Sequence, residues 1–279
     1  MPKPIALTIA GSDSGGGAGI QADIKAMEAN GVFATSALAA VTAQNTEAVV
    51  EAHDLPPALV GAQIDAVAED MDVRAVKTGM LSNPDIIETV VDRIRTHDLR
   101  PLVVDPVMIS KTGFKLLKDE AIETLREALL PRARVITPNV HEAEHLTDVG
   151  SIDSTADLRT AGTALLETGA EAVVVKGGHL SGEEAAVDVL VEGEEVHELS
   201  APRIDTRHTH GTGCTYASAI AANLAKGYAL PPAVERAKRY VTGAIRHALP
   251  VGQGRGPTNH FFHLDAEAAL RDGADTTEK

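Results

Sequence analysis

Short apolar runs alternate along the chain with longer segments in which apolar residues recur at helical spacing. The runs are rich in Val, Ile and Ala, which is typical of strands buried on both faces of a sheet. The longer segments place apolar residues three and four positions apart, which predicts helices packed on that sheet. The predicted strands are 5–10, 35–42, 74–77, 102–104, 135–137 and 172–175, with a hairpin of 186–191 and 196–199 around Gly193; the predicted helices are 20–30, 59–70, one beginning at Pro84, 119–130, 156–168, 215–226 and 232–248.

This alternation of strands and helices predicts a single α/β domain. A β-α-β order forms a mostly parallel sheet with helices on both faces, which makes three layers. The 279 residues contain no Pro/Ser-rich or low-complexity linker, so we expect one domain over residues 1–265. Residues 266–279 are expected to form a polar C-terminal tail.

Polar residues and glycines stand where the predicted strands end. They are Gly11–Asp13, Gln44, Lys77–Gly79, Asp105, Asn139 and Lys176. In open α/β sheets, ligands bind beyond the carboxyl ends of the strands. We therefore expect these residues to meet in one crevice.

The charge of the chain narrows the classes of partner. It carries 40 acidic side chains against 25 Lys and Arg, a formal net charge of −15. This excess argues against binding to nucleic acid and to anionic membranes, both of which call for a basic surface. It fits equally a source adapted to high salt and ordinary acidic solubility.

Cysteine content and apolar runs bear on the location of the protein. The single cysteine excludes an internal disulfide. The apolar run that follows Met1 is too short for a signal peptide, and no run approaches the ~20 apolar residues of a membrane-spanning helix. We therefore expect a cytoplasmic protein.

Gly211-Thr212-Gly213-Cys214 precedes an Ala-rich helical segment. Glycines let the backbone approach a ligand, and the free N–H groups at the start of a helix attract anions such as phosphate. The same position lowers the pKa of a thiol, so Cys214 could accept a proton from an attacking hydroxyl. The alternatives are a plain glycine loop and a small buried apolar cysteine.

Three further groups suit phosphate chemistry. Asp105 ends a strand and Glu142 opens a helix after Asn139, and hard oxygen ligands of this kind suit Mg²⁺. Lys176, also at a strand end, could neutralise phosphate charge. The glycines of residues 15–19 form no P-loop, because no Gly-Lys-Ser/Thr follows them, and are either a flap over a substrate or a tight connection.

Residues 141–145 match the H-E-x-x-H pattern of zinc proteases. His141 and His145 would share one helix face with Glu142 as the base. Against this interpretation, the segment follows a strand end inside an α/β alternation, and no third ligand is fixed by its spacing. His208 and His210 flank a loop and are expected to be ordinary exposed histidines.

Taken together, the motifs resemble those of a known family. They are Thr8–Gly16, Gly19–Lys25, Ala43–Thr46, Lys77–Leu81, Val104–Met108, Thr137–Asn139, Glu142-Ala143, Val175–His179 and Thr209–Thr215. In this order they resemble the ribokinase-like superfamily, and within it the hydroxymethylpyrimidine/phosphomethylpyrimidine kinases of thiamin synthesis. The resemblance implies a three-layer α/β/α ribokinase-like fold, ATP and Mg²⁺ as cofactors, and a pyrimidine alcohol as the small-molecule substrate. It also implies a second phosphorylation, of the monophosphate to the diphosphate, and a homodimer.

The resemblance also assigns roles to particular residues. The anion hole would be Gly211, Thr212 and Gly213, with Cys214 as the base; the metal would be held by Asp105 and Glu142, and the nucleotide by Lys176, Asn139 and, more weakly, Lys238; the pyrimidine pocket would be Gln44, Gly11, Asp23, Met80 and Val107.

A Gln amide matches an aminopyrimidine edge. That edge presents a donor NH₂ beside an acceptor ring nitrogen, and the amide offers an acceptor and a donor in return. Pyridoxine and pyridoxal lack this edge, so Gln44 favours a pyrimidine over the pyridoxal kinase alternative. A non-catalytic pyrimidine or ATP sensor is the more distant alternative, and the presence of Cys214, Lys176 and Glu142 argues against it.

Overall fold

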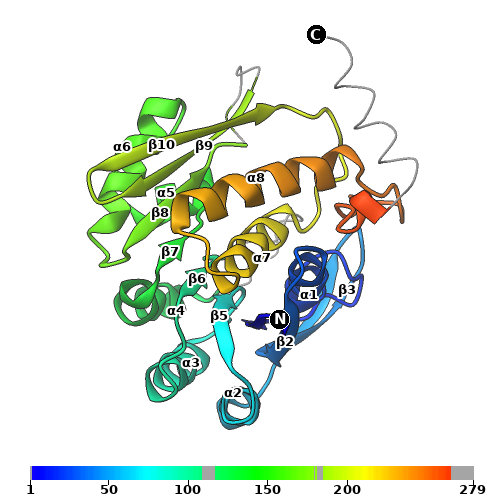
Figure 1. Cartoon of the computed structure of the whole chain (residues 1–279), viewed down its shortest axis with the longest axis vertical. Helices are drawn as coiled ribbons and strands as arrows, with labels where there is room; N and C mark the ends of the chain where they lie inside the picture. Colours follow the sequence, from blue (N-terminus) through cyan, green and yellow to red (C-terminus); the bar gives the residue numbers. More distant parts are fainter. Residues whose placement is uncertain (1, 109–116, 179, 181–184, 265–279) are drawn as a thin grey trace.

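The computed structural model describes residues 2–108, 117–178, 180 and 185–264, and these form three layers (Figure 1). The strands of the central layer are β1 (Ile5–Ala10), β2 (Phe33–Leu38), β5 (Val73–Thr78), β6 (Leu102–Val104), β7 (Val135–Ile136), β8 (Ala172–Lys176), β9 (Ala185–Glu192) and β10 (Glu195–Pro202). Within the described residues they form one eight-stranded sheet, in the order β10-β9-β8-β7-β6-β5-β1-β2. In this sheet, neighbouring strands from β8 through β7, β6, β5 and β1 to β2 are parallel. Strand β9 is antiparallel to both β8 and β10.

Helices cover both faces of this sheet. They are α1 (Gly19–Ala29), α2 (Pro57–Ala68), α3 (Pro84–Thr96), α4 (Asp119–Thr124), α5 (Val140–Leu146), α6 (Thr155–Leu166), α7 (Thr212–Ala225) and α8 (Leu230–Arg246). One apolar core packs the helices α2, α3, α4, α5 and α6 against one face of the sheet. A second core packs α1, α7 and α8 against the opposite face. The predicted α/β/α architecture is therefore confirmed.

Helix α7 lies at the centre of its layer, between α1 and α8 (Figure 1). Every residue from Thr215 to Ala225 is buried. The many alanines of this segment keep its surface small, so the helix packs closely against the sheet and both neighbouring helices. A tightly packed helix gives the residues at its first turn a fixed position.

The strand order reverses beside β1. The chain continues from β1 to β2 on one side, whereas β5 to β8 extend the sheet from the other side of β1. Such a switch point opens a crevice at the carboxyl ends of the strands. Residues that directly follow β1, β5 and β6 therefore stand at a natural binding site.

The predicted strand 35–42 is in fact two strands. The chain leaves the central sheet at Ala39, and β3 (Ala40–Gln44) pairs with β4 (Val49–Asp54) in a separate antiparallel sheet. The apolar run continues through Ala39 and gives no sign of this break. Strand β4 was missed because Glu51, His53 and Asp54 interrupt its apolar pattern.

Two further expectations concern the ends of elements. The predicted helix 119–130 is regular only to Thr124 and continues as a π-helical turn, Leu125–Leu129, and a 3₁₀ turn, Leu130–Arg132. The predicted tail, residues 266–279, lies outside the described residues. No helix in the described part of the chain combines the length and the apolar character needed to cross a membrane.

Candidate active site

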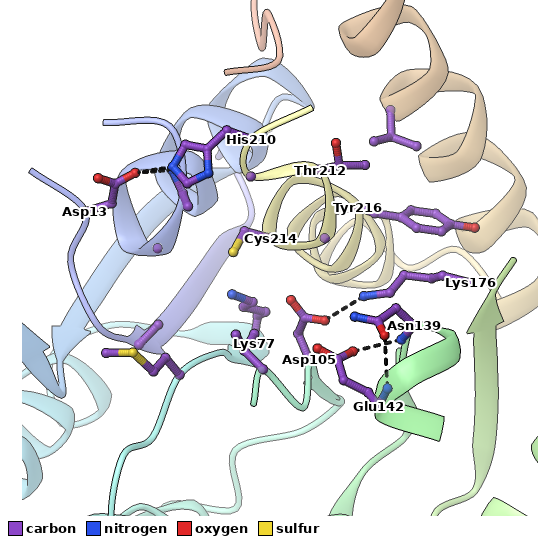
Figure 2. A pocket seen from close by; sticks show the side chains of 18 of the residues that line it. Asp13, Lys77, Asp105, Asn139, Glu142, Lys176, His210, Thr212, Cys214 and Tyr216 are labelled. Atoms are coloured by element: carbon purple, nitrogen blue, oxygen red, sulfur yellow. Dashed lines mark hydrogen bonds and ion pairs between the residues drawn. The ribbon is translucent and has the colours of Figure 1, made fainter. Parts of the chain in front are cut away.

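A cavity of about 250 Å³ opens at the carboxyl ends of the parallel strands. Its lining includes thirteen of the fourteen predicted site residues: Gly11, Gln44, Met80, Asp105, Val107, Asn139, Glu142, Lys176, Gly211, Thr212, Gly213, Cys214 and Lys238. Gln44 and Cys214 thus share one cavity although they are far apart in the chain. Figure 2 shows Cys214 between the Asp13–His210 pair and the Asp105–Lys176 pair.

The first turn of α7 forms one wall of the cavity. Gly211 precedes the helix with a φ of 74°, a conformation that favours glycine, and a Cβ at this position would overlap the carbonyl oxygen of Gly17. No side chain among the described residues caps this helix end by a hydrogen bond. The backbone N–H groups at the start of α7 are therefore suited to an anionic ligand.

Cys214 occupies this first turn, but its environment differs from the predicted one. Burial raises the pKa of the thiol to about 12, and the negative charges of Asp23 and Asp105 act in the same direction. The positive charge of Lys77 and a hydrogen bond from the Gly19 backbone oppose the rise without cancelling it. The expected lowering of the Cys214 pKa is therefore wrong, because these surroundings favour the neutral thiol.

Lys77 and Asp23 form a fully buried ion pair. The Lys77 ammonium lies 2.8 and 2.9 Å from the two carboxylate oxygens of Asp23, and both side chains have no exposed surface. Thr8 and Ser218 also donate hydrogen bonds to Asp23, at 2.6 and 2.7 Å. Burial alone would lower the pKa of Lys77. The negative charge of Asp23, with smaller contributions from Cys214 and Asp105, raises the pKa above its ordinary value.

Asp23 was expected to line the pyrimidine pocket, and the structure places it elsewhere. Lys77 lines the cavity and Asp23 does not. The carboxylate is held away from the cavity because all the partners described above take up its oxygens. The sequence pattern assigned no chemical role to Lys77, although its place near the end of β5 predicted that it lies in the crevice.

A second charged group lies at the ends of β6 and β8. Lys176 donates to Asp105 at 2.9 Å, and the hydroxyl of Thr137 donates to the same oxygen at 3.1 Å. Burial raises the pKa of Glu142 to about 7; the positive charge of Lys176 opposes this rise, and the negative charge of Asp105 adds to it. Asp105 and Glu142 supply the hard oxygen ligands that suit Mg²⁺.

Asn139 and Glu142 are held in place by the start of α5. The Asn139 side chain accepts from the Glu142 N–H at 3.0 Å, and the Glu142 carboxylate accepts from the Asn139 N–H at 2.8 Å. This reciprocal arrangement fixes both side chains. Within the described residues, no three His, Cys, Asp or Glu side chains form a metal cage, so a cation here would rely on water and ligand oxygens.

The zinc-protease pattern is explained by this local structure. His141 and His145 are exposed, whereas Glu142 is buried and belongs to the helix cap. The two imidazoles and the carboxylate therefore face different surroundings. The match to H-E-x-x-H reflects a capping residue between two surface histidines.

Lys238 and Asp188 form an ion pair at another part of the cavity. Lys238 on α8 donates to Asp188 on β9 at 2.7 Å, and Asp188 also accepts from the Gly177 N–H at 3.0 Å. Val241 and Ile245 of α8 line the same cavity and add an apolar surface. Lys238 is thus a paired lysine beside an apolar wall.

His210 was expected to be exposed, which is wrong. Its side chain is only 14% exposed, lies 2.8 Å from the Asp13 carboxylate and lines the same cavity as Gln44. Asp13 in turn accepts from the backbone N–H groups of Gly15, Gly17 and Ala18, and so shapes the glycine loop. Both residues lie in the quoted motifs, but their partners are distant in sequence and could not be paired from spacing.

Comparisons with known proteins identify the family of this chain. The family model described as phosphomethylpyrimidine kinase matches residues 13–259. The chain is 53% identical over 264 residues to the hydroxymethylpyrimidine/phosphomethylpyrimidine kinase of Streptomyces coelicolor, covering 95% of this chain and 97% of that one. It is 48% identical to the bifunctional thiamine biosynthetic enzyme TH1 of Arabidopsis thaliana, covering 94% of this chain and 51% of that one.

A solved structure shows the same fold. The chain is similar to the ADP complex of Bacillus subtilis pyridoxal kinase, with a TM-score of 0.87 and 39% identity over 97% of this chain and 99% of that one. The expected ribokinase-like arrangement is therefore confirmed.

Proposed function

The chain belongs to the phosphomethylpyrimidine kinase family, and from this premise we propose that it phosphorylates 4-amino-5-hydroxymethyl-2-methylpyrimidine with ATP. The product is the monophosphate, which the same enzyme converts to the diphosphate for thiamin biosynthesis. The observation that carries this assignment is that Gln44 and Cys214 line one cavity with the charged groups around Asp105.

In this proposal the pyrimidine lies beside Gln44, Met80 and Val107, which line the cavity together. The Gln44 amide binds the aminopyrimidine edge through an acceptor and a donor. Met80 and Val107 contact the ring and its methyl group. Gly11 leaves room for this arrangement, because a Cβ there would overlap the Met80 side chain.

Charge stabilisation dominates the transfer step. Phosphoryl transfer needs in-line placement and positive charge around the phosphoryl oxygens rather than covalent help. The Gly211–Gly213 amides and Lys176 supply that charge, while Asn139 and Lys238 lie at the nucleotide side. When bound at Asp105 and Glu142, Mg²⁺ neutralises phosphate charge.

Cys214 takes the proton of the substrate hydroxyl as the new O–P bond forms. It can do so only as a thiolate, whereas burial favours the thiol. The positive charge of Lys77 favours the thiolate, and the negative charge of Asp105 opposes it. Any cation that offsets Asp105 therefore makes Cys214 a better base.

The substrate is tested by comparing kcat/KM for the pyrimidine alcohol and for pyridoxal, with mono- and diphosphate products resolved by chromatography. We expect a clear preference for the pyrimidine and the appearance of both products. A preference for pyridoxal would overturn the assignment in favour of the activity named for the Bacillus subtilis structure. Tight binding of pyrimidine without turnover of Mg–ATP would support the sensor alternative instead.

Two further proposals follow from family membership. The first is a homodimer, in which exposed apolar side chains such as Phe33, Val41 and Val50 on β2, β3 and β4 would be covered. Light scattering would test it. The second is a cytoplasmic location, which agrees with the use of ATP.

A further inference from the structure

The Asp13–His210 pair has no role in the mechanism above, yet it touches the residue that reads the substrate. The His210 Nε2 atom lies 2.8 Å from Asp13 Oδ2 and 3.4 Å from Gln44 Nε2. Figure 2 shows the imidazole directed toward Asp13 beside the start of α7. One ring nitrogen therefore faces both a carboxylate and the end of the Gln44 amide.

The His210 ring is held firmly in this position. Its backbone N–H donates to Gly256 at 3.1 Å, and its carbonyl accepts from Thr258 at 3.3 Å. The ring packs against Gly17, where a Cβ would come within 2.5 Å of the imidazole. A ring with so little freedom can fix the groups it contacts.

The hydrogen bonds of Asp13 show which nitrogen of His210 carries a hydrogen. Asp13 accepts from the backbone N–H groups of Gly15, Gly17 and Ala18 at 2.8, 3.0 and 2.8 Å, and three such donors stabilise an ionised carboxylate. Burial would raise the pKa of Asp13, but the bond and charge of His210 and these backbone donors lower it. His210 Nε2 therefore carries a hydrogen that it donates to Asp13, and has no lone pair for a second donor.

The other end of the Gln44 amide faces Thr42. The Thr42 hydroxyl lies 2.8 Å from the Ser12 carbonyl oxygen and 3.3 Å from Gln44 Oε1. The carbonyl can only accept, so it takes the single hydroxyl hydrogen at the shorter distance. Thr42 then presents a lone pair to the amide.

Both neighbours favour the same amide orientation. The Nε2 hydrogen of His210 is donated to Asp13, but its positive charge still repels the Gln44 NH₂ and attracts the amide oxygen at this side of the ring. A lone pair at Thr42 attracts the amide NH₂. Rotation of the amide by about 180° satisfies both contacts, because its oxygen and nitrogen are nearly equal in size.

We propose that the Asp13–His210 pair is a positioning device that locks the Gln44 amide with its oxygen toward His210 and its NH₂ toward Thr42. The inference rests on the proposed reading of the pyrimidine by Gln44. In this orientation the 4-amino group of the substrate lies beside Gln44 Oε1, and the adjacent ring nitrogen lies beside Gln44 Nε2. The lock makes the order of donor and acceptor in the substrate decisive.

The test pairs a change in His210 with a change in the substrate. Wild type and His210→Leu are compared on the pyrimidine alcohol and on its analogue without the 4-amino group, with Mg–ATP saturating. We expect wild type to prefer the amino substrate by at least ~100-fold in kcat/KM. In His210→Leu, where the amide is free to rotate, this preference falls about tenfold, mainly through a higher KM for the amino substrate.

Rescue and control variants separate positioning from general stability. His210→Gln places an N–H donor where Nε2 stood, and restores most of the preference. His208→Leu alters the same loop outside the cavity lining, where His208 Nδ1 accepts from Gly256 at 3.0 Å, and leaves the preference unchanged. If His210→Leu does not fold, His210→Asn makes the same test, because its amide is too short to reach the Nε2 position.

The outcomes are distinct. An unchanged preference in His210→Leu, whatever the loss of kcat, overturns the lock but leaves the kinase assignment intact. Failure of His210→Gln to restore the preference also contradicts it. Failure of wild type to phosphorylate the amino substrate removes both proposals.

Discussion

The properties of single residues in the cavity depend on neighbours that are remote in sequence. The position of Cys214 at a helix start suggested a lowered pKa, and the fold reverses this through burial and the charges of Asp23 and Asp105. The residue types of the site could be identified from motifs. Their ionisation could not, because it depends on which side chains the fold brings together.

If Cys214 is a neutral thiol, alkylating reagents should react with it slowly. In the unliganded protein at pH 7.5, we expect iodoacetamide to label the single cysteine at least ~100-fold more slowly than a free thiol, because only the thiolate reacts. The rate should keep rising by about tenfold per pH unit through pH 9. Intact-mass spectrometry measures it, with Cys214→Ser as the blank, and a plateau below pH 9 would show a lower pKa.

The buried Lys77–Asp23 pair should be sensitive to loss of one partner. Lys77→Met leaves the Asp23 carboxylate buried without its counter-charge, which should cost about 3–5 kcal/mol of unfolding free energy. The double variant Lys77→Met/Asp23→Asn removes both charges and should recover much of this loss. Urea denaturation of the single and double variants provides the measurement, and equal stability of the two would argue against a charge effect.

At the scale of elements, the sequence predicts those whose pattern is uniform. Strands β1 and β6 match their predicted ranges, and α3 begins at Pro84 as predicted, with its first turn capped by the Asn83 side chain. The break at Ala39 was missed because tertiary hydrogen bonds, to Ala10 and from Leu55, turn the chain there. Local pattern contains no trace of such partners.

The glycine before α7 offers a matched test of close backbone approach. Gly211 and Gly227 flank the same helix and both have positive φ, but only Gly211 packs against another backbone segment, at Gly17. Gly227→Ala should cost about 1 kcal/mol from strain alone. Gly211→Ala should cost about 2–4 kcal/mol and weaken the use of ATP. Equal losses in thermal unfolding and in kcat/KM for ATP would contradict this account.

His260 links the segment after α8 to α7 and should confer pH dependence. Its ring lies 2.9 Å from the Thr215 hydroxyl, and burial, followed by the charge of Lys25, lowers its pKa to about 4. The unfolded chain takes up this proton below about pH 6.5, whereas the folded chain does not until about pH 4. Stability therefore falls as pH drops through this window, by about 2 kcal/mol between pH 7 and pH 5 from this group.

Replacement of His260 should make the free energy of unfolding depend less steeply on pH. We expect His260→Gln to lose less unfolding free energy than wild type between pH 7 and pH 5, whatever its stability at pH 7. His141→Gln, which removes an exposed imidazole, serves as the control and should keep the wild-type slope. Parallel slopes for His260→Gln and wild type would exclude His260 as the source.

For the whole molecule, the topology of the sheet explains why the site could be located from sequence. Residues that follow parallel strands gather at one edge, so Gly11, Gln44 and Asp105 could be placed together before their contacts were known. Gln44 is the last residue of β3 in the small antiparallel sheet, yet the β3–β4 pair still brings it to the same cavity. The Asp13–His210 contact could not be predicted from sequence, because the two residues are 197 positions apart and no sequence motif links them.

The central claim is that Gln44 and Cys214 act on one bound molecule, and it is tested most directly by measuring pyrimidine affinity and turnover on two variants. Gln44→Leu should weaken binding of the pyrimidine alcohol by about 10–100-fold, because the edge of the ring loses its partner. Cys214→Ala should bind it as wild type does and lose about 100-fold or more in kcat with Mg–ATP. Unchanged affinity in Gln44→Leu, or unchanged turnover in Cys214→Ala, would contradict the account.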